Sequence, residues 1–366
     1  MRRLRIFKRF HCSSFISLIK GWTRSCCLPC LSLSRSPRGG HLEWMAACCD
    51  PFFDYCERSV WLIGMFCFIL VIFGISLVVF TFYSYMVPFL YKTESGPIFT
   101  FYFIYGHYLL INITFHYFKG VYTDPGKSIK GSGVKLTDLQ IKNGWKTCYK
   151  CDARKPPRAH HCRICGKCVF KMDHHCPWMF NCVGQYNHRH FMLFIIFMWL
   201  GVCYVVHCSW TRVVAGMQFD RGFLKSIFDT LGMAAGIERA RDYPLDHRGQ
   251  ESFLVIVVFF ICFGVAIALL LLGGWNMYLI GRGETAIEFY TNKRDASECK
   301  RAGKKFVNPY NHGFKKNWYL FLGLNTRRSF LCHVLLPSGH APIEDGMDWL
   351  RCDAPPTSNG LASSNV

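Results

Sequence analysis

Charged side chains are scarce in this sequence. Asp, Glu, Lys and Arg make up 18% of its 366 residues, whereas 51% are hydrophobic. An ordinary soluble domain carries about 25% charged residues. The shortage of charge therefore excludes an ordinary soluble globular domain and indicates several membrane-spanning segments.

Acidic residues are scarcer than basic ones. The chain contains 23 Asp and Glu against 43 Lys and Arg, which gives a net charge of +20. No basic helix, platform of stacking aromatic residues or nucleic-acid-binding motif accompanies this charge, so we expect no nucleic-acid partner. Anionic lipid headgroups or a polyanionic cosubstrate explain the charge better.

Four long apolar segments contain no Asp, Glu, Lys or Arg. This absence argues against the intramembrane ion path that a cation transporter needs. Each segment is long enough to cross a bilayer core of about 30 Å, which takes about 20 helical residues. The segments are residues 60–86, 98–118, 191–210 and 253–280. The sequence therefore predicts an α-helical integral membrane protein with four transmembrane helices.

The segments that connect these helices differ in their Lys and Arg content, and this bias predicts the orientation. Residues 1–59 contain ten Lys or Arg and residues 119–190 contain fourteen, whereas residues 87–97 contain one. In residues 215–251, five basic residues are outnumbered by six acidic ones. We therefore expect both termini and the loop 119–190 to face the cytosol, where thiols stay reduced.

The predicted spans divide the chain into eight regions. They are a cytosolic basic N-terminal region (1–59), transmembrane helices 1 and 2 (60–118), a cytosolic Cys/His-rich domain (119–190), transmembrane helix 3 (191–210), a lumenal loop (211–252), transmembrane helix 4 (253–280), a cytosolic C-terminal region (281–350) and a disordered tail (351–366). The tail is predicted to be disordered because Pro, Ser, Asn and Gly dominate it.

The Cys/His-rich domain repeats one pattern twice. A Cys-x2-Cys pair is followed by a His ten residues after its second Cys, and by another Cys seven residues after that His. The two interleaved sets are Cys148, Cys151, His161 and Cys168, and Cys162, Cys165, His175 and Cys182. Zinc takes four thiolate or imidazole ligands in a tetrahedron, so the repeat predicts two zinc sites. A disulfide scaffold competes with this interpretation, and the predicted cytosolic location argues against it.

Each predicted zinc site has four protein ligands and no open position, so we expect both ions to be structural. Once the eight ligands are assigned, Asp173, His174 and Cys176 remain beside one another. A Cys needs a neighbouring base to become a thiolate, and the base needs an orienting partner. A spare thiol in a zinc domain can also be inert, but these neighbours favour Cys176 as a nucleophile. Phe191 opens the third span fifteen residues later, which predicts a thiol at the membrane surface.

The segment around this thiol resembles the DHHC family of protein S-acyltransferases (palmitoyltransferases). It reads Lys171-Met-Asp-His-His-Cys-Pro-Trp, followed by Asn-Cys-Val-Gly184. Thr-Asp-Pro-Gly at 123–126 and Asn-Pro-Tyr-Asn-His-Gly at 308–313 are similar to further motifs of that family. The basic N-terminus and the tail motifs resemble its ER/Golgi-type members. The resemblance extends to about Gly323, and it implies four transmembrane helices with a cytosolic two-zinc DHHC domain of small β-hairpins and loops.

The resemblance also implies a reaction. A long-chain acyl group passes from palmitoyl-CoA to Cys176, with His174 as general base and Asp173 orienting that base, and then to a substrate cysteine. Lys155 and Arg158 would hold CoA phosphates, although a solvated basic face attracted to anionic lipid is the other interpretation. The implied partners are acyl-CoA, membrane lipids and substrate proteins with membrane-proximal cysteines. The implied location is the endoplasmic reticulum or the Golgi.

One departure from the family pattern leaves alternatives open. The family usually carries Thr-Thr-x-Glu after the fourth span, and this chain has Thr285-Ala286-Ile287-Glu288. The hydroxyl missing at Ala286 would help to position Asp173, and one such hydrogen bond is worth about 0.5–1.5 kcal/mol. A catalytically weak DHHC-like scaffold is therefore one alternative. A membrane ubiquitin ligase with a RING-type zinc domain is another, although its ligand spacing differs.

Overall fold

The computed structural model describes residues 41–127, 135–216, 249–325 and 327–352. The chain divides into two units, Met1–Ile63 and Gly64–Val366, and every site considered below belongs to the second. Parts of five predicted regions lie outside the described residues. These parts are residues 1–40 of the N-terminal region, 128–134 of the Cys/His-rich domain, 217–248 of the lumenal loop, residue 326 of the C-terminal region and 353–366 of the tail.

Within the residues that the structure describes, four helical stretches are long and apolar enough to cross a membrane, which confirms the predicted class of fold. They are Trp61–Thr93, Gly96–Tyr122, His188–Val213 and Phe253–Gly281. The first combines helix α3 (His41–Thr81), a π-helical turn η4 (Phe82–Met86) and helix α4 (Val87–Thr93). The other three belong to helices α5 (Gly96–Tyr122), α7 (His188–Gly216) and α10 (Gly249–Gly281).

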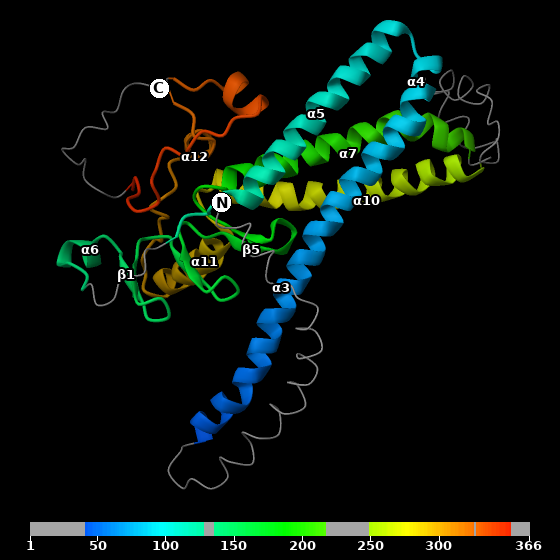
Figure 1. The fold of residues 1–366 in the computed structure, drawn as a ribbon. Coiled ribbons are helices and arrows are strands. Elements are labelled where there is room, and N and C mark those ends of the chain that lie inside the picture. Colours follow the sequence, from blue (N-terminus) through cyan, green and yellow to red (C-terminus); the bar gives the residue numbers. More distant parts are fainter. Residues whose placement is uncertain (1–40, 128–134, 217–248, 326, 353–366) are drawn as a thin grey trace. The chain divides into compact units, whose positions relative to one another are not determined.

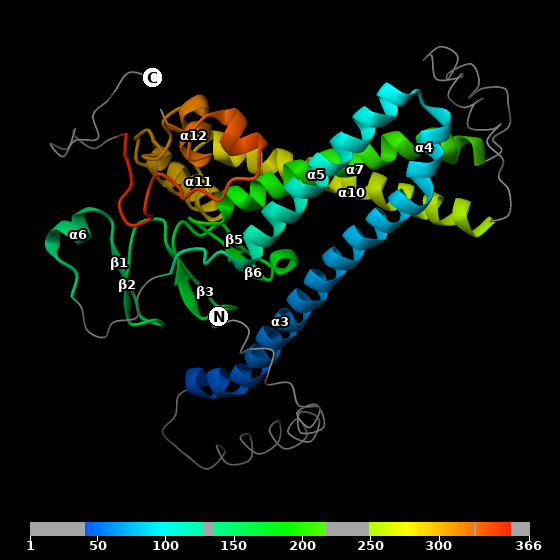
Figure 2. The same cartoon turned by 45° about the horizontal axis from the view of Figure 1, so that its top comes forward.

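Helix α7 packs against both α5 and α10, and the three lie side by side in Figures 1 and 2. Glycines allow the close approach. A Cβ added at Gly201 of α7 would come within 2.7 Å of Ile113 on α5, and one at Gly106 within 2.9 Å of the Tyr204 hydroxyl. Helices in lipid associate through such close van der Waals packing, because the surrounding hydrocarbon is as apolar as their side chains.

Three antiparallel hairpins of two strands each lie between α5 and α7 in the sequence. They pair β1 (Lys146–Cys148) with β2 (Ala153–Lys155), β3 (His160–Cys162) with β4 (Lys167–Val169), and β5 (His174–Cys176) with β6 (Asn181–Val183). The short helix α6 (Asp138–Lys142) precedes them, and the 3₁₀ turn η5 (Pro177–Met179) separates β5 from β6. Isolated two-stranded hairpins are marginally stable in water. These hairpins therefore need cross-links or neighbouring helices to hold them.

The C-terminal region contains helices α11 (Ala286–Arg301) and α12 (Phe314–Phe321) and the π-helical turn η6 (Leu331–Leu335). Asn308 and Asn317 hold this region against the end of α10. Asn317 donates to the carbonyl of Gly281 at 2.8 Å, and Asn308 donates to the carbonyl of Arg282 at 3.1 Å. These side chains satisfy carbonyls that the end of the helix leaves without intrahelical partners.

Candidate active site and metal clusters

The structure brings the eight predicted ligands together in the two predicted sets. The sets are Cys148, Cys151, His161 and Cys168, and Cys162, Cys165, His175 and Cys182, and in each the four ligand atoms lie within 4.8 Å of one another. Three thiols and one imidazole form the soft donor set that zinc prefers in closed structural sites. The residues present therefore fit a metal ion, and each cluster could hold one.

The strand register explains the spacing of the ligands. His161 on β3 lies directly opposite Cys168 on β4, and His175 on β5 lies directly opposite Cys182 on β6. A His and a Cys separated by six residues are thus cross-strand neighbours, with side chains on the same face of their hairpin. In each set the Cys-x2-Cys pair of the preceding hairpin supplies the other two thiols. The interleaved sequence pattern therefore ties successive hairpins to one another.

His174 lies between an acid and a thiol. Its Nδ1 is 2.6 Å from Oδ2 of Asp173, and the Cys176 thiol lies close enough to affect its pKa. Burial alone would lower the pKa of His174, but Asp173 and Cys176 outweigh it and raise the pKa to about 9. A protonated imidazole beside a thiol stabilises the thiolate. The three residues that remained after ligand assignment are therefore connected in space as well as in sequence.

The carboxylate of Asp173 is held at both oxygens. Oδ1 accepts a hydrogen bond from the backbone amide of Ala286 at 2.7 Å, while Oδ2 faces His174. Burial alone would raise the pKa of Asp173, yet His188, His174 and this amide together hold it well below its usual range. Ala286 is the first residue of α11, and the amides of the first turn of a helix have no partner within the helix. The amide therefore supports Asp173 at the position where the sequence suggested lost support.

Sequence reasoning missed this contact because the amide belongs to no particular side chain. A local signal was present, however. Thr285 and Glu288 form a capping box: Thr285 Oγ1 accepts from the amide of Glu288 at 3.2 Å, and Glu288 Oε2 accepts from the amide of Thr285 at 2.9 Å. Thr-x-x-Glu before a helix is a recognisable N-terminus. It locates the unpaired amides that an acidic side chain can use.

Cys176 is 4% exposed and belongs to an apolar cluster that includes side chains of α5 and α7. Tyr117 and Phe194 belong to the same cluster, with ring centroids 5.0 Å apart, and Phe191 packs edge-on against the ring of His174. The thiol therefore lies among apolar side chains at the ends of two candidate membrane spans. This surrounding suits a reaction partner with a hydrocarbon chain.

The two predicted phosphate-binding cations differ in their surroundings. The Arg158 side chain is 5% exposed and forms a two-pronged ion pair with Glu288, with both contacts at 2.7 Å. It also donates to the carbonyl of Gly283 and lies 4.4 Å from the ring centroid of Tyr310. The solvated basic face that the sequence left open does not include Arg158, because a buried carboxylate draws the guanidinium inward. Lys155, at the end of β2, is half-buried.

Two asparagines fasten the last hairpin to the end of α5. Asn181 donates to the carbonyls of Val121 and Thr123 at 3.1 and 3.0 Å. Asn187 donates to the carbonyls of Cys182 and Gly120 at 2.8 and 3.1 Å. Both side chains are buried. They place the strand that carries Cys182, and with it the neighbouring strand that carries Cys176, at a membrane helix.

Comparison with known proteins agrees with this arrangement. Residues 141–293 match the profile of the family described as DHHC palmitoyltransferase. Palmitoyltransferase ZDHHC16 of Homo sapiens is 36% identical over 326 residues, which cover 87% of this chain and 83% of the relative. Palmitoyltransferase ZDHHC16A of Danio rerio is 35% identical over 82% of this chain and 81% of its own. The probable protein S-acyltransferase 15 of Arabidopsis thaliana is 30% identical over 63% of this chain.

The similarity decides between the classes of protein that the sequence left open. It extends over the membrane spans as well as the Cys/His-rich domain, because the aligned regions cover more than 80% of both chains for the first two relatives. A RING-type ubiquitin ligase is excluded by this membership. The chain therefore belongs to the DHHC palmitoyltransferase family and is a protein-cysteine S-acyltransferase.

Proposed function

We propose that Cys176 carries the acyl group during transfer. In the first step, its thiolate attacks the thioester carbonyl of a long-chain acyl-CoA, the carbonyl carbon exchanges its bond to CoA for one to Sγ, and CoA leaves with the proton of His174. In the second step, a substrate thiol gives its proton to His174 and attacks the acyl-Cys176 thioester. Cys176 leaves as the thiolate and His174 is protonated again, so the site returns to its starting state.

The contact that carries this proposal is the 2.6 Å approach of His174 Nδ1 to Asp173 Oδ2, beside a thiol that belongs to neither metal set. With Nδ1 donating to the carboxylate, Nε2 is the nitrogen that serves the thiol. Asp173 then fixes the orientation of the ring, and the amide of Ala286 fixes Asp173. A pair of acceptor contacts on one carboxylate leaves it little rotational freedom, so the imidazole is aligned before the donor binds.

We propose zinc as the ion in both clusters. The donor set supports zinc, and the four protein ligands of each set leave no position for a substrate. When bound, the ions would cross-link hairpins that are too short to be stable alone. Their contribution to catalysis is therefore to hold the strand that carries His174 and Cys176.

We propose palmitoyl-CoA or a similar long-chain acyl-CoA as the donor, with Lys155 and Arg158 near its phosphates. Lys155 supports this proposal as a cation in the domain that carries Cys176. Arg158 uses Nε and Nη2 for Glu288 and Gly283, which leaves Nη1 for a phosphate oxygen. The acceptors would be cysteines of membrane-associated proteins, because Cys176 lies at the ends of membrane spans.

We propose that both termini and the DHHC domain face the cytosol in a membrane of the endoplasmic reticulum or the Golgi. The excess of Lys and Arg in residues 1–59 and 119–190 supports this orientation. The clusters require six Cys and the reaction requires Cys176, and the reduced state of these seven thiols also suits the cytosol. Glycan acceptor sites placed in residues 217–248 should be modified in cells, and sites placed near residue 360 should stay unmodified.

The decisive experiment incubates the purified full-length protein with an alkyne-tagged palmitoyl-CoA. Wild type should acquire a label that hydroxylamine removes, because a thioester links it to the protein. Cys176→Ser should acquire none and should keep about two zinc ions per chain, since Cys176 belongs to neither metal set. Cys332→Ser, which removes an exposed thiol, is the matched control and should label like wild type.

Three outcomes would contradict the proposal. Hydroxylamine-sensitive label in Cys176→Ser at the wild-type level would place the acyl intermediate elsewhere. Loss of about one zinc ion per chain in the same variant would show that Cys176 is a ligand and that the assignment of the two sets is wrong. A wild-type protein that contains two zinc ions but never acquires label would favour the scaffold alternative.

A further inference from the structure

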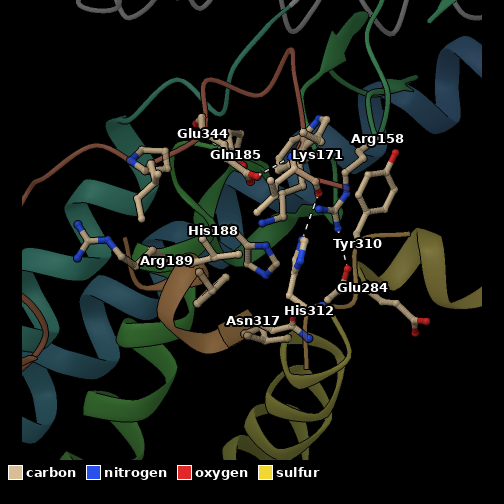
Figure 3. Close-up of a pocket in the computed structure, with 18 of the residues that line it drawn as sticks. Arg158, Lys171, Gln185, His188, Arg189, Glu284, Tyr310, His312, Asn317 and Glu344 are labelled. Carbon is tan, nitrogen blue, oxygen red and sulfur yellow. Dashed lines mark hydrogen bonds between the residues drawn. The ribbon is translucent and has the colours of Figure 1, made fainter. Parts of the chain in front are cut away.

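A cavity lies between the DHHC domain, the ends of α7 and α10 and the C-terminal region. Its volume is about 60 Å³. A single water needs roughly 10–15 Å³ by this measure, so the cavity has room for several waters or for one phosphate-sized group. Six basic side chains line it: Arg158, Lys171, His188, Arg189, His312 and His340. Figure 3 labels the first five of them.

Four of these six side chains are already engaged. Arg158 is paired with Glu288, and Arg189 donates to the carbonyls of Ser338 and His340 at 2.8 and 3.1 Å. His340 contacts the Ser338 hydroxyl and the carbonyl of Leu322, both at 2.9 Å. His312 contacts the Cys352 thiol and the carbonyl of Leu350, both at 3.2 Å. These bonds account for the positions of four basic groups without a ligand.

Lys171 and His188 remain. His188 is 4% exposed, and neither of its ring nitrogens has a hydrogen-bond partner in the structure. Lys171 approaches the rings of Phe321 and Trp349 at 5.7 and 5.4 Å, and among the described residues no carboxylate lies within ion-pair distance of its ammonium group. Buried polar nitrogens are normally paired, so the imidazole of His188 indicates a missing acceptor, and the half-buried Lys171 is a cation without a counter-charge at the same cavity.

The two side chains point into the same space. His188 packs edge-on against Phe321 with ring centroids 5.0 Å apart, and Lys171 lies over the same ring. Figure 3 shows Lys171 and His188 turned toward the cavity from two different segments. The cavity also has two carboxylates, but both are occupied. Glu284 accepts from Arg282 and Asn292, and Glu344 accepts from the amide of Leu350.

We propose that this cavity binds a phosphate group, with Lys171 and His188 as its donors. An ammonium supplies up to three N–H donors and an imidazole one, and charge-assisted bonds of this kind are the strong ones. The phosphate comes either from free orthophosphate or from the monoester headgroup of a lipid, since the cavity lies at the ends of two membrane spans. Bound there, it ties the C-terminal region to the domain that carries Cys176. The site does not depend on the acyl-transfer step.

Equilibrium binding of radiolabelled orthophosphate to the purified, zinc-loaded full-length protein tests this site. Wild type should bind about one phosphate per chain. Lys171→Gln should weaken binding at least about tenfold and His188→Gln by a smaller factor, whereas Lys171→Arg should retain binding. Lys146→Gln removes the same charge from an exposed position on β1 and should bind like wild type. Zinc content near two per chain checks the fold of each variant.

A second arm distinguishes the two sources of phosphate. The same proteins are placed in phosphatidylcholine vesicles with or without 10 mol% phosphatidic acid, about one lipid in ten, and their thermal unfolding is measured in phosphate-free buffer. A rise in Tm of about 2–4 °C with phosphatidic acid, lost in Lys171→Gln, identifies a lipid headgroup. The same rise with orthophosphate alone identifies the free ion.

Three results would overturn the proposal. The first is no phosphate binding and no Tm shift in either arm, which would leave water as the only occupant. The second is equal binding by wild type and Lys171→Gln. The third is a higher KM for palmitoyl-CoA in Lys171→Gln without any effect of phosphate, which would make the cavity part of the donor site.

Discussion

Strands β3 and β5 have the same sequence, His-His-Cys, and different fates. His160–Cys162 and His174–Cys176 lie fourteen residues apart, with the same burial pattern and the same register in their hairpins. In both, the second His faces a Cys across the hairpin and joins it in a metal set. The third residue differs. Cys162 joins the second metal set, whereas no third set exists among the described residues to take Cys176.

The comparison shows how a structural repeat supplies a nucleophile. The residue before the tripeptide is Ala159 in the β3–β4 hairpin and Asp173 in the β5–β6 hairpin, and both are buried. Burial, followed by nearby Lys155, lowers the pKa of His160. For His174, Asp173 and Cys176 reverse the effect of burial and raise the pKa to about 9. One added carboxylate and one unclaimed thiol thus turn a metal-binding hairpin into a candidate catalytic one.

The largest effect should come from replacing each of the two cysteines, Cys162 and Cys176, in turn. Cys162→Ser removes a metal ligand, so we expect zinc content to fall from about two to about one per chain. The hairpins that this ion holds should become sensitive to protease, and activity should be lost. Cys176→Ser should lose activity with zinc and protease resistance unchanged. Metal analysis and limited proteolysis of both variants measure this. Equal zinc loss in the two variants would remove the distinction between the hairpins.

The second largest effect tests how the β3–β4 hairpin is attached to α11. Arg158, just before β3, pairs with Glu288 on α11. Glu288→Gln leaves the buried guanidinium without a counter-charge, and breaking a buried pair in this way destabilises a protein by about 3–5 kcal/mol. We expect a matching fall in the free energy of unfolding. Glu298→Gln on the exposed face of the same helix is the control and should change it by less than about 1 kcal/mol. Equal effects would mean that the pair contributes no special stability.

A smaller effect tests how the β5–β6 hairpin is attached to the same helix. Ala286→Pro removes only the amide that supports Asp173, because Pro is tolerated at the first position of a helix and the preceding Thr285 is extended. A hydrogen bond to a charged group is worth about 1.5–3 kcal/mol, so we expect kcat to fall about 10- to 100-fold. Ala286→Gly keeps the amide and should stay near wild type. A fully active Ala286→Pro would show that Asp173 needs no such support.

The smallest effect is expected from restoring the family residue. Ala286→Thr adds a hydroxyl near an Asp173 carboxylate that already accepts the backbone amide at 2.7 Å. We therefore expect kcat to rise by less than about threefold, since a further neutral hydrogen bond is worth at most about 1.5 kcal/mol and competes with an existing one. The palmitoyl-CoA turnover assay measures this. A tenfold gain would restore the view that this chain is one hydroxyl short.

Much of the site was predictable because it is local. The two ligand sets follow from spacing alone, since a His and a Cys separated by six residues become cross-strand neighbours in a hairpin. Cys176 could then be predicted as the nucleophile, because it remains beside Asp173 and His174 once the eight ligands are assigned. The burial of Arg158 could not be predicted in this way, because its partner Glu288 lies 130 residues away.

By itself, the sequence determined the four candidate spans, the two metal sets and the thiol that belongs to neither. Apolar run length and ligand spacing are properties of short stretches of chain, and they survive in any fold that satisfies them. Only the tertiary structure decided that the start of α11 supports both hairpins, through Glu288 for Arg158 and through the Ala286 amide for Asp173. It also decided that Lys171 and His188 share a cavity. These contacts join segments distant along the chain, and a backbone amide or an unpaired nitrogen leaves no mark in the amino-acid sequence.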